Sequence, residues 1–244
     1  YGNGGGRTIA IPPGQPFAGR SAGGGDRSQV YGNSVYGSGY PGLAGQRGTT
    51  GLGFPFFFWP LVWGGGAAGG VAYLHNHEAL FTRMRQYGDP NNTTRPGGPM
   101  AQAAFQSNTT GTIYRVVSDN STVASLITSV DANCTSSDLG SSSSEPSPYT
   151  GATTDPQPEQ TIQYYRASSV SLTLDGYNNT AALGNDTNAP PTPLPSGIDT
   201  VLLGCLNDTI GAAVPLVDGA SALAVPSLGA MALLWVALAT LQRL

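Results

Sequence analysis

The stretch TIYRVVSDNSTVASLITSVDANC, Thr112 to Cys134, decides the fold. Its first seven residues are rich in β-branched and aromatic side chains, and this composition predicts a strand over Thr112–Ser118. Asp119 or Asn120 is the expected N-cap of a following helix, because either side chain can accept a hydrogen bond from the first turn. The helix has apolar residues at the spacings i, i+3, i+4 and i+7, namely Val123, Leu126, Ile127 and Val130.

A second amphipathic helix is predicted in PSGIDTVLLGCLNDTIGAAV, residues 195–214. Cys205 lies on its apolar stripe, and Cys134 ends the first helix. We therefore expect a disulfide between them, which closes a loop of about 70 residues and stabilises the fold by about 4 kcal/mol. Two buried free thiols are the alternative. A metal or redox site is not expected, because the spacing of the two cysteines matches no such motif. The apolar stripe contains Ile198, Val201, Leu202, Cys205, Leu206 and Ile210.

The chain between these helices contains one clear strand pattern. Alternating apolar residues in SVSLTLDG, residues 169–176, predict a strand with one buried side and a turn at its end. EQTIQYYRA, residues 159–167, predicts a short helix, and residues 135–158 form a Ser/Pro/Thr-rich loop that suits O-glycans. Residues 111–217 are therefore predicted to form one small α+β domain with the order strand, helix, long loop, helix, strand, long loop, helix.

Residues 1–53 are a low-complexity segment rich in glycine and tyrosine, without helical or strand periodicity. Ordering them costs on the order of 50–100 kcal/mol of backbone entropy, which their scattered apolar side chains cannot offset. We expect an extended segment that is disordered alone and becomes ordered only where another surface supplies the burial.

The segment GFPFFFWPLVWGGGAAGG, residues 53–70, is too apolar to lie in water. Prolines and glycines oppose a helix, so we predict an extended buried ribbon over residues 54–74, with glycines that let another backbone approach closely. The alternatives are a distorted membrane segment, because these 21 residues carry no charge, and disorder. Six aromatic side chains fall within ten positions and bury roughly 900–1,500 Å² when packed: Phe54, Phe56, Phe57, Phe58, Trp59 and Trp63.

Residues 75–110 are predicted to hold a short helix, Glu78–Tyr87, followed by a linker over residues 88–110. His75 and His77 lie two positions apart, with Glu78 next to them, and could contribute to a copper or zinc site. Because no further ligand is visible, we interpret them as solvated loop histidines and expect neither a metal nor a cofactor.

The C-terminal segment, residues 218–244, contains a 14-residue apolar run, Leu228–Leu241. Small residues ahead of a hydrophobic end resemble a lipid-anchor signal that is cleaved, with Gly219 and Ser221 as candidate attachment sites. The alternative is a retained tail that packs against other copies of the chain through Leu233, Leu234 and Trp235.

Asn-x-Ser/Thr sequons predict the compartment. Eight of them predict passage through the secretory pathway and a coat of N-linked glycans, while a polar loop composition that generates sequons by chance is the alternative. The sequence begins at Tyr1 and not at Met, as expected where a leader has been removed. We place the protein outside the cell, at the cell surface or in the wall. The sequons are at Asn91, Asn92, Asn108, Asn120, Asn133, Asn178, Asn185 and Asn207.

Neither charge nor motifs predict nucleic acid or catalysis. Residues 1–100 carry seven arginines and three acidic residues, whereas residues 101–244 carry three arginines and eleven acidic residues. The arginines are too dispersed to bind nucleic acid, although the two parts could attract each other within or between chains. GSGYPG, residues 37–42, matches a dinucleotide motif but lacks a flanking strand and helix, and no nucleophile motif is present. We expect a protein that is not an enzyme.

Several segments resemble secreted surface proteins of mushroom-forming fungi. They are AGRSAGGGDRSQVYGNSVYGSGYPG (residues 18–42), GFPFFFWPLVWGGG (53–66), RPGGPM (95–100) and QYYRASSVSLTLDGYNNTAAL (163–183). The likeness covers most of the chain and implies an extracellular location. That family has no assigned activity, so the resemblance implies no role for any particular residue.

These features predict a non-catalytic extracellular structural glycoprotein that self-assembles into fibres or a cell-wall layer. The aromatic ribbon, the Gly/Tyr-rich segment and the apolar tail would supply the contacts between copies by strand addition and burial. The alternative is a glycolipid-anchored surface receptor or adhesin whose tail has been cleaved, with membrane contact at that end. A secreted enzyme is the third hypothesis.

Overall fold

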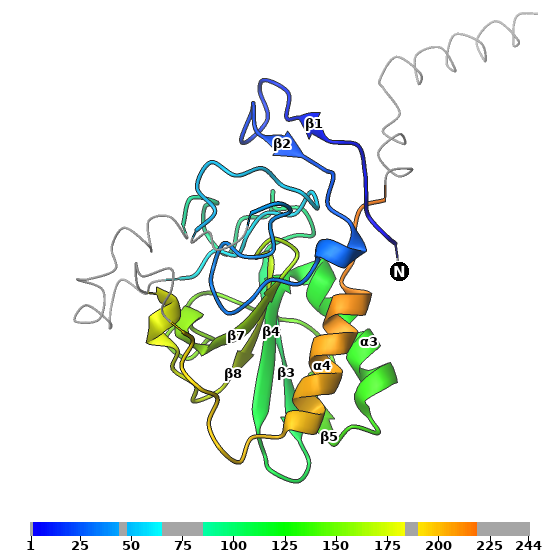
Figure 1. The fold of residues 1–244 in the computed structure, drawn as a ribbon, viewed down its shortest axis with the longest axis vertical. Helices are drawn as coiled ribbons and strands as arrows, with labels where there is room; N and C mark the ends of the chain where they lie inside the picture. The colour runs from blue at the N-terminus through cyan, green and yellow to red at the C-terminus, as the bar shows by residue number, and fades with distance from the viewer. Residues whose placement is uncertain (1, 44–47, 65–84, 184–189, 219–244) are drawn as a thin grey trace, which may run out of the picture.

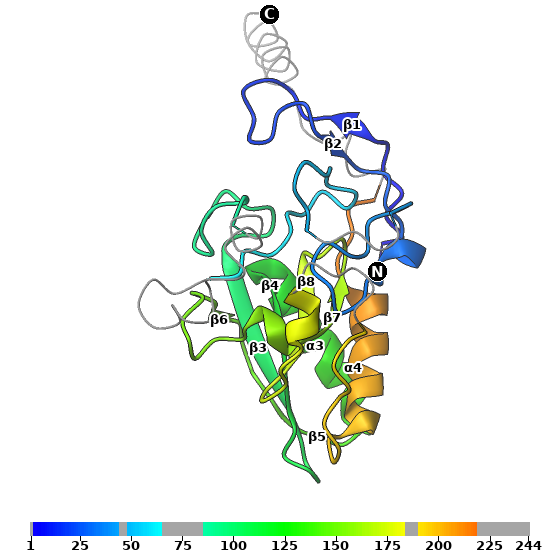
Figure 2. The same ribbon diagram turned by 60° about the vertical axis from the view of Figure 1, so that its left-hand side comes forward.

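A central antiparallel sheet carries two helices on one face, as Figures 1 and 2 show, and this confirms the predicted α+β class. The structure, a computed structural model, describes residues 2–43, 48–64, 85–183 and 190–218. The sheet has the order β5-β3-β4-β8-β7, and β6 also pairs with β3. Its strands are β3 (Met100–Ser107), β4 (Ile113–Asp119), β5 (Leu139–Ser142), β6 (Ser147–Pro148), β7 (Thr161–Tyr165) and β8 (Val170–Leu174).

Both predicted helices are present, as α3 (Asn120–Cys134) and α4 (Thr200–Ala213). Each begins after an aspartate whose carboxylate accepts hydrogen bonds from the first turn, Asp119 for α3 and Asp199 for α4. The predicted disulfide is confirmed: it joins the end of α3 to the middle of α4, and the two Cα atoms lie 5.7 Å apart. The remaining short elements are β1 (Ile9–Ala10), β2 (Ser21–Ala22), η1 (Arg27–Gln29), η2 (Pro158–Gln160) and η3 (Thr180–Leu183).

The linker predicted over residues 88–110 is wrong at its C-terminal end, because Met100–Ser107 forms the strand β3. β3 pairs with β4 from Met100 opposite Asp119 to Gln106 opposite Ile113. Its three alanines and two glutamines give it a low strand propensity, which concealed it in the sequence. The β3–β4 hairpin also crosses residue 111, where the sequence placed the start of the α+β domain.

The short helix predicted over residues 159–167 is also wrong. Thr161–Tyr165 is the strand β7, which pairs with β8, and only the single turn η2 precedes it. Tyr164 and Tyr165 are both buried, but they belong to different core clusters, because neighbouring side chains of a strand point to opposite faces. Both faces of β7 are therefore covered.

The middle of the sheet is buried on both faces, as β8 shows along its whole length. Its residues Val170 and Leu172 share a core with the helices, as the predicted alternation requires. The intervening Ser171 and Thr173 are buried as well, and Ser171 Oγ lies 3.0 Å from Thr161 Oγ1 on β7. A second core, which contains Trp63, lies against the face of the sheet away from the helices.

The N-terminal segment, which we define as the described part of residues 2–64, packs across the upper end of the sheet in Figures 1 and 2. It adds main-chain pairs to the free edge of β7: Gly32 N donates to Tyr164 O at 2.9 Å, and Tyr164 N donates to Asn33 O at 2.8 Å. The surface that the low-complexity segment needs for burial is therefore supplied by the α+β part of the same chain.

The last described residue, Asp218, lies beside the N-terminal segment. Gly4 N donates to Asp218 Oδ1 at 2.7 Å. Arg27 donates from Nη1 to Val214 O and from Nη2 to Gly2 O, both at 2.6 Å. Both ends of the described chain are thus held at the same end of the molecule. Among the described helices, none has the length and apolar character that crossing a membrane requires.

Candidate functional site

The most unusual backbone of the molecule is the turn between β7 and β8. Arg166, Ala167 and Ser168 have φ values of 51°, 50° and 60°, which place three successive non-glycine residues in the left-handed region. Each such residue costs on the order of 1–3 kcal/mol, so the surroundings must hold the turn in place. The N-terminal segment does so, because Leu61 N donates to Ser168 O and Arg166 N donates to Val30 O.

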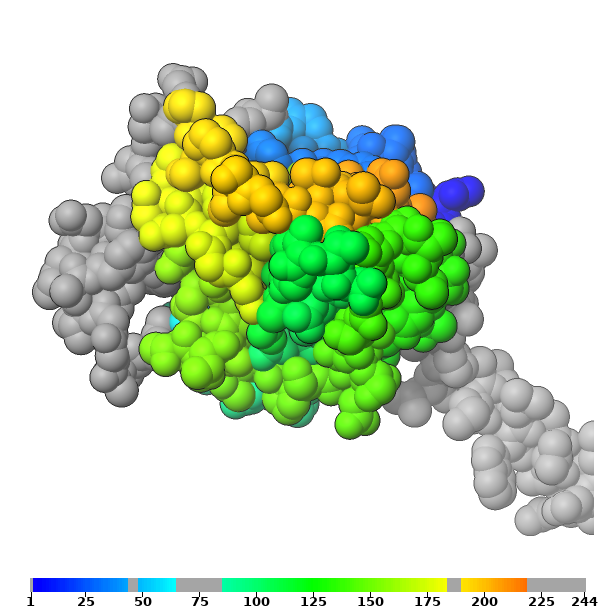
Figure 3. Space-filling view, turned by 90° about the horizontal axis from the view of Figure 1, so that it is seen from below, coloured from blue at the N-terminus to red at the C-terminus, as the bar shows by residue number. Residues whose placement is uncertain are grey.

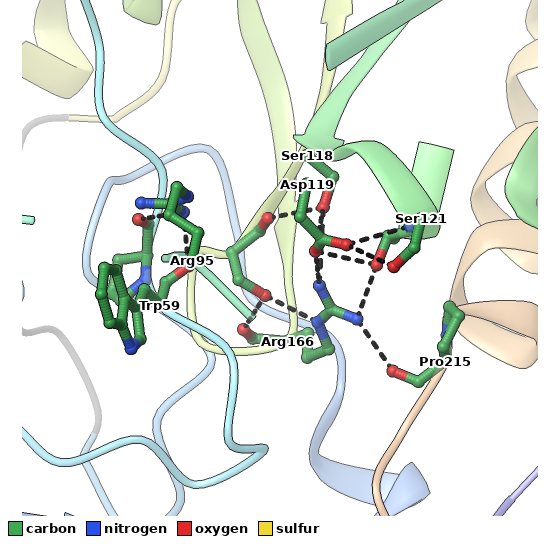
Figure 4. A network of polar contacts seen from close by, with 10 residues as sticks. Trp59, Arg95, Ser118, Asp119, Ser121, Arg166 and Pro215 are labelled. Carbon is green, nitrogen blue, oxygen red and sulfur yellow. Dashed lines mark hydrogen bonds and ion pairs between the residues drawn. The ribbon is translucent and has the colours of Figure 1, made fainter. Parts of the chain in front are cut away.

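This turn points the side chain of Arg166 into the protein, where it is fully buried. Figure 4 shows its guanidinium between the end of β4 and Pro215. Nη2 donates to Asp119 Oδ2 at 2.7 Å, Nη1 to Thr122 Oγ1 at 3.0 Å and to Pro215 O at 2.8 Å, and Nε to Ser169 Oγ at 2.7 Å. One side chain therefore joins β4, the start of α3, the β7–β8 turn and the segment after α4.

Arg166 and Asp119 each favour the ionised form of the other. Burial lowers the pKa of the Arg166 guanidinium to about 10, while Asp119 raises it, so that the side chain stays charged at neutral pH. Burial raises the pKa of Asp119, but the Arg166 charge and the hydrogen bonds from Thr122 outweigh it and hold that pKa below its ordinary value. The guanidinium also stacks on Phe58 of the N-terminal segment, 3.5 Å from the ring centroid.

A second buried arginine, Arg95, lies farther along the same region (Figure 4). Its Nη2 donates to the main-chain oxygens of Trp59 at 3.0 Å and Pro60 at 2.9 Å, and its guanidinium lies over the Trp59 ring. Burial lowers its pKa to about 10. Two buried cations thus hold the aromatic part of the N-terminal segment, Arg166 through Phe58 and Arg95 through the backbone.

The aromatic residues 54–63 are packed inside the chain, and this corrects their predicted role as contacts between copies. Phe54 and Phe56 are 2% exposed and Trp63 is fully buried, while the other three aromatics are half-buried. The predicted close approach of another backbone does occur, since a Cβ on Gly64 would overlap the Cα of Gly151. The aromatics stabilise the fold and are not a free apolar surface.

Replacing Trp63 by phenylalanine is expected to lower the free energy of unfolding by about 2–3 kcal/mol. The change removes the hydrogen bond from Nε1 to Tyr164 Oη, 3.0 Å long, and leaves a gap beside Tyr149. Urea unfolding followed by circular dichroism measures the loss. Trp59→Phe, at a half-buried ring, is the matched control and should cost about 1 kcal/mol or less. Equal stability of wild-type protein and Trp63→Phe would contradict this packing.

The described sequons lie at the surface. Asn91, Asn108, Asn120, Asn133 and Asn178 are exposed, whereas Asn92 and Asn207 are half-buried and Asn185 lies outside the described residues. Three of them already bond within the fold: Thr94 N donates to Asn92 Oδ1 at 2.9 Å, Asn133 Nδ2 donates to Ser129 O at 2.6 Å, and Tyr165 Oη donates to Asn207 Oδ1 at 2.8 Å. A glycan at any exposed site would extend into solvent.

No catalytic constellation forms among the described residues. Two open hollows have volumes of about 350 and 370 Å³, and their described linings contain no charged side chain and no histidine. The part of the chain that the structure describes holds no group of three or more His, Cys, Asp or Glu side chains fit for a metal ion. Among the described residues, none directly before the GSGYPG stretch, residues 37–42, forms a strand and none directly after it forms a helix.

Several predicted site residues cannot be placed. The histidine pair His75 and His77, with most of the helix Glu78–Tyr87, lies outside the described residues. So do the candidate anchor sites Gly219 and Ser221 and the tail residues Leu233, Leu234 and Trp235.

Sequence reasoning missed the Arg166 network. Asp119 was expected only as a helix cap, and Arg166 only as part of a short helix. The available signal was compositional: Arg166 is one of three arginines in the acidic part of the chain, next to two tyrosines. Its partner could not be inferred, because 47 positions separate it from Asp119.

Comparisons with protein-family models, with curated proteins and with solved structures find no match to this chain. Its class therefore follows from its own geometry: an α+β fold with one disulfide, a buried Arg–Asp pair and surface sequons. The chemistry of the network is structural, because every contact of Arg166 described above ties one part of the chain to another.

Proposed function

We propose that the protein is a non-catalytic extracellular glycoprotein, presented at a cell surface or in a wall layer from its C-terminal end. The distribution of sequons carries this proposal: five exposed asparagines in such sites lie on one disulfide-bonded fold. Disulfides persist in oxidising compartments, and N-glycans are attached in the secretory pathway. The two features therefore point to the same compartment independently.

The positions of the chain end and the glycan sites support presentation from the C-terminus. The described residues end at Asp218, next to the N-terminal segment. The β3–β4 turn, which contains Asn108, lies at the opposite end of the sheet in Figure 1. If the apolar C-terminal segment serves as an anchor signal, as its sequence predicts, this turn and its glycan project away from the membrane or wall.

In this proposal the aromatic segment stabilises a single molecule. Any contact between copies uses other residues, and the apolar run Leu228–Leu241 is the strongest candidate. The resemblance to fungal surface proteins agrees with display at a wall. The N-terminal segment then stabilises the displayed fold by packing across one end of its sheet.

Mass spectrometry of the secreted protein tests the proposal. We expect N-glycans on Asn108 and Asn178, which lie in exposed connecting segments, and a C-terminus that ends near Ser221 and carries a glycolipid. Asn108→Gln should remove one glycan mass and leave the others. An intact Leu244 would favour assembly through a retained tail. A chain that carries no N-glycan at all would contradict an extracellular glycoprotein.

A further inference from the structure

A proline-rich segment with a single threonine leads into α4. Residues 190–195 read PPTPLP, so Thr192 stands between Pro191 and Pro193. Every residue from 190 to 197 is exposed, and residues 190–195 belong to neither a helix nor a strand. Figure 3 shows the yellow-orange chain that leads into α4 on the surface of the molecule. Because proline fixes one backbone angle, the segment is presented to solvent in an extended conformation.

The fold holds this segment by the main chain of Thr192. Its nitrogen donates to Asn179 Oδ1 at 2.9 Å, and its carbonyl oxygen accepts from Tyr177 Oη. Both of these partners are buried, so they fix the position of the threonine. The Thr192 hydroxyl group has no hydrogen-bond partner among the residues that the structure describes. The contacts with the fold therefore position Thr192 and leave its Oγ1 available to react.

The strand β6 contains a residue with the same neighbours in sequence. Ser147 stands between Pro146 and Pro148 and is likewise exposed. Its hydroxyl group, however, donates to Gln102 O at 3.2 Å, and its backbone pairs with β3. Opening one such hydrogen bond lowers the fraction of molecules that can react by about fivefold to tenfold. The local sequence is therefore equivalent at Thr192 and Ser147, and the fold distinguishes them.

The loop that composition favours for O-glycans, residues 135–158, uses several of its hydroxyl groups within the fold. Ser142 Oγ and Thr150 Oγ1 each donate to an aspartate carboxylate, at 2.6 and 2.9 Å. Its other exposed hydroxyl groups, such as that of Ser144, lack a proline on both sides. Composition and structure therefore favour different positions for an O-linked sugar.

An open hollow beside Thr192 has room for the first sugar. Its volume is about 370 Å³, and its described lining includes the apolar side chain of Leu194 and the ring of Tyr177. Asn33 and Gln163 contribute amide groups to the same lining. Apolar surface with a few polar groups suits a sugar, whose ring has an apolar face and hydroxyl groups at its edge.

We propose that Thr192 carries an O-linked sugar, and that the folded surface selects it over Ser147. The sugar is a hexose or an N-acetylhexosamine from a phosphate-activated donor. Thr192 Oγ1 loses its proton and forms a bond to the anomeric carbon of the sugar. The bond from that carbon to the donor's phosphate oxygen breaks, and the phosphate leaves with the electron pair. The inference rests on the proposed function, because it requires the passage through the secretory pathway that the sequons predict.

Mass spectrometry of the full-length protein, secreted by a eukaryotic host, locates the sugar. After enzymatic removal of N-glycans, cleavage before aspartates separates the two sites: Thr192 lies in residues 186–198 and Ser147 in residues 138–154. Electron-transfer fragmentation keeps an O-linked sugar on its residue and distinguishes a hexose from an N-acetylhexosamine by mass. We expect the sugar on Thr192, with an occupancy about fivefold to tenfold or more above that of Ser147.

Three variants provide the controls. Thr192→Val removes the hydroxyl group and keeps the branched shape, so residues 186–198 should lose the sugar, whereas Thr192→Ser should keep it. Ser147→Ala should leave the O-linked mass of the protein unchanged. After enzymatic removal of the sugars, Thr192→Val should unfold at the same urea concentration as the wild-type protein, because the hydroxyl group makes no hydrogen bond within the described fold.

Two outcomes would overturn the inference. A protein that carries N-glycans but an unmodified Thr192 would refute it and leave the proposed function standing. Equal occupancy of Thr192 and Ser147 would show that the sugars are added before the chain folds, so that the structure does not select the site. A chain with neither kind of glycan would contradict the proposed function as well.

Discussion

Replacing Arg166 by methionine is expected to lower the free energy of unfolding by about 3–5 kcal/mol. The variant leaves the Asp119 carboxylate buried without its counter-ion, and it leaves Pro215 O and Ser169 Oγ without a donor. It also removes the cation that stacks on Phe58, which weakens the packing of the N-terminal segment on the β7–β8 turn. Urea unfolding measures the loss, and limited proteolysis should cut residues 2–64 faster.

Arg115→Met is the matched control. Arg115 makes a two-pronged ion pair with Asp175, but the two side chains are 29% and 33% exposed, so water screens the pair. We expect a loss of about 1 kcal/mol or less. If Arg166→Met and Arg115→Met lower the free energy of unfolding equally, Arg166 does not have the proposed role of joining these parts of the chain. Asp119→Asn distinguishes the effect of the charge from the effect of helix capping. It removes the negative charge, while asparagine still caps α3.

The same pair predicts how stability depends on pH. The pKa of Asp119 is lower in the folded protein than in the unfolded chain, because the attraction of Arg166 and the hydrogen bonds from Thr122 outweigh desolvation. Its contribution is therefore complete above the unfolded pKa, near 4, and disappears as the pH falls through the folded pKa. Arg166→Met should reduce this acid-dependent part of the stability.

Removing the Cys134–Cys205 disulfide is expected to lower the free energy of unfolding by about 4 kcal/mol. The sequence separation of 71 residues makes the closed loop long, and the entropy that the bond removes from the unfolded chain grows with loop length. The double variant Cys134→Ala, Cys205→Ala tests this by urea unfolding without reductant.

Wild-type protein unfolded in the presence of reductant provides the control, because it loses the bond and keeps both side chains. The two measurements should agree within about 1 kcal/mol. If reductant leaves the wild-type unfolding curve unchanged, the cysteines are not joined in the secreted protein.

The elements with strong local periodicity were predicted correctly. α3, α4 and β8 each carry a pattern of apolar residues that repeats within the element itself. The cap of α3 is Asp119, one of the two predicted residues, whereas the cap of α4, Asp199, was not predicted. The disulfide followed from where its cysteines lie on two such helices. β3 and β7 were missed, because alanine, glutamine and tyrosine give no clear period and these strands are defined by distant partners.

The sequence did not predict which part of the protein each apolar segment packs against. Periodicity says that a side chain needs burial, but it does not say against what. The six aromatics of residues 54–63 therefore suggested contacts between copies, whereas other parts of the same chain cover them. Phe54 and Trp63 belong to the core on the far face of the sheet, and Phe56 belongs to the core shared with the helices. The order of the N-terminal segment likewise depends on the free edge of β7 and on the buried charge of Arg166.

The amino-acid sequence by itself determined the α+β class, the two helices, the cysteine pairing and the positions of the sequons, because each follows from spacing along the chain. Tertiary structure alone decided the Arg166–Asp119 pair and the burial of the aromatics. Each of these depends on distances between residues far apart in sequence, and only the pairing of strands and the packing of helices set such distances.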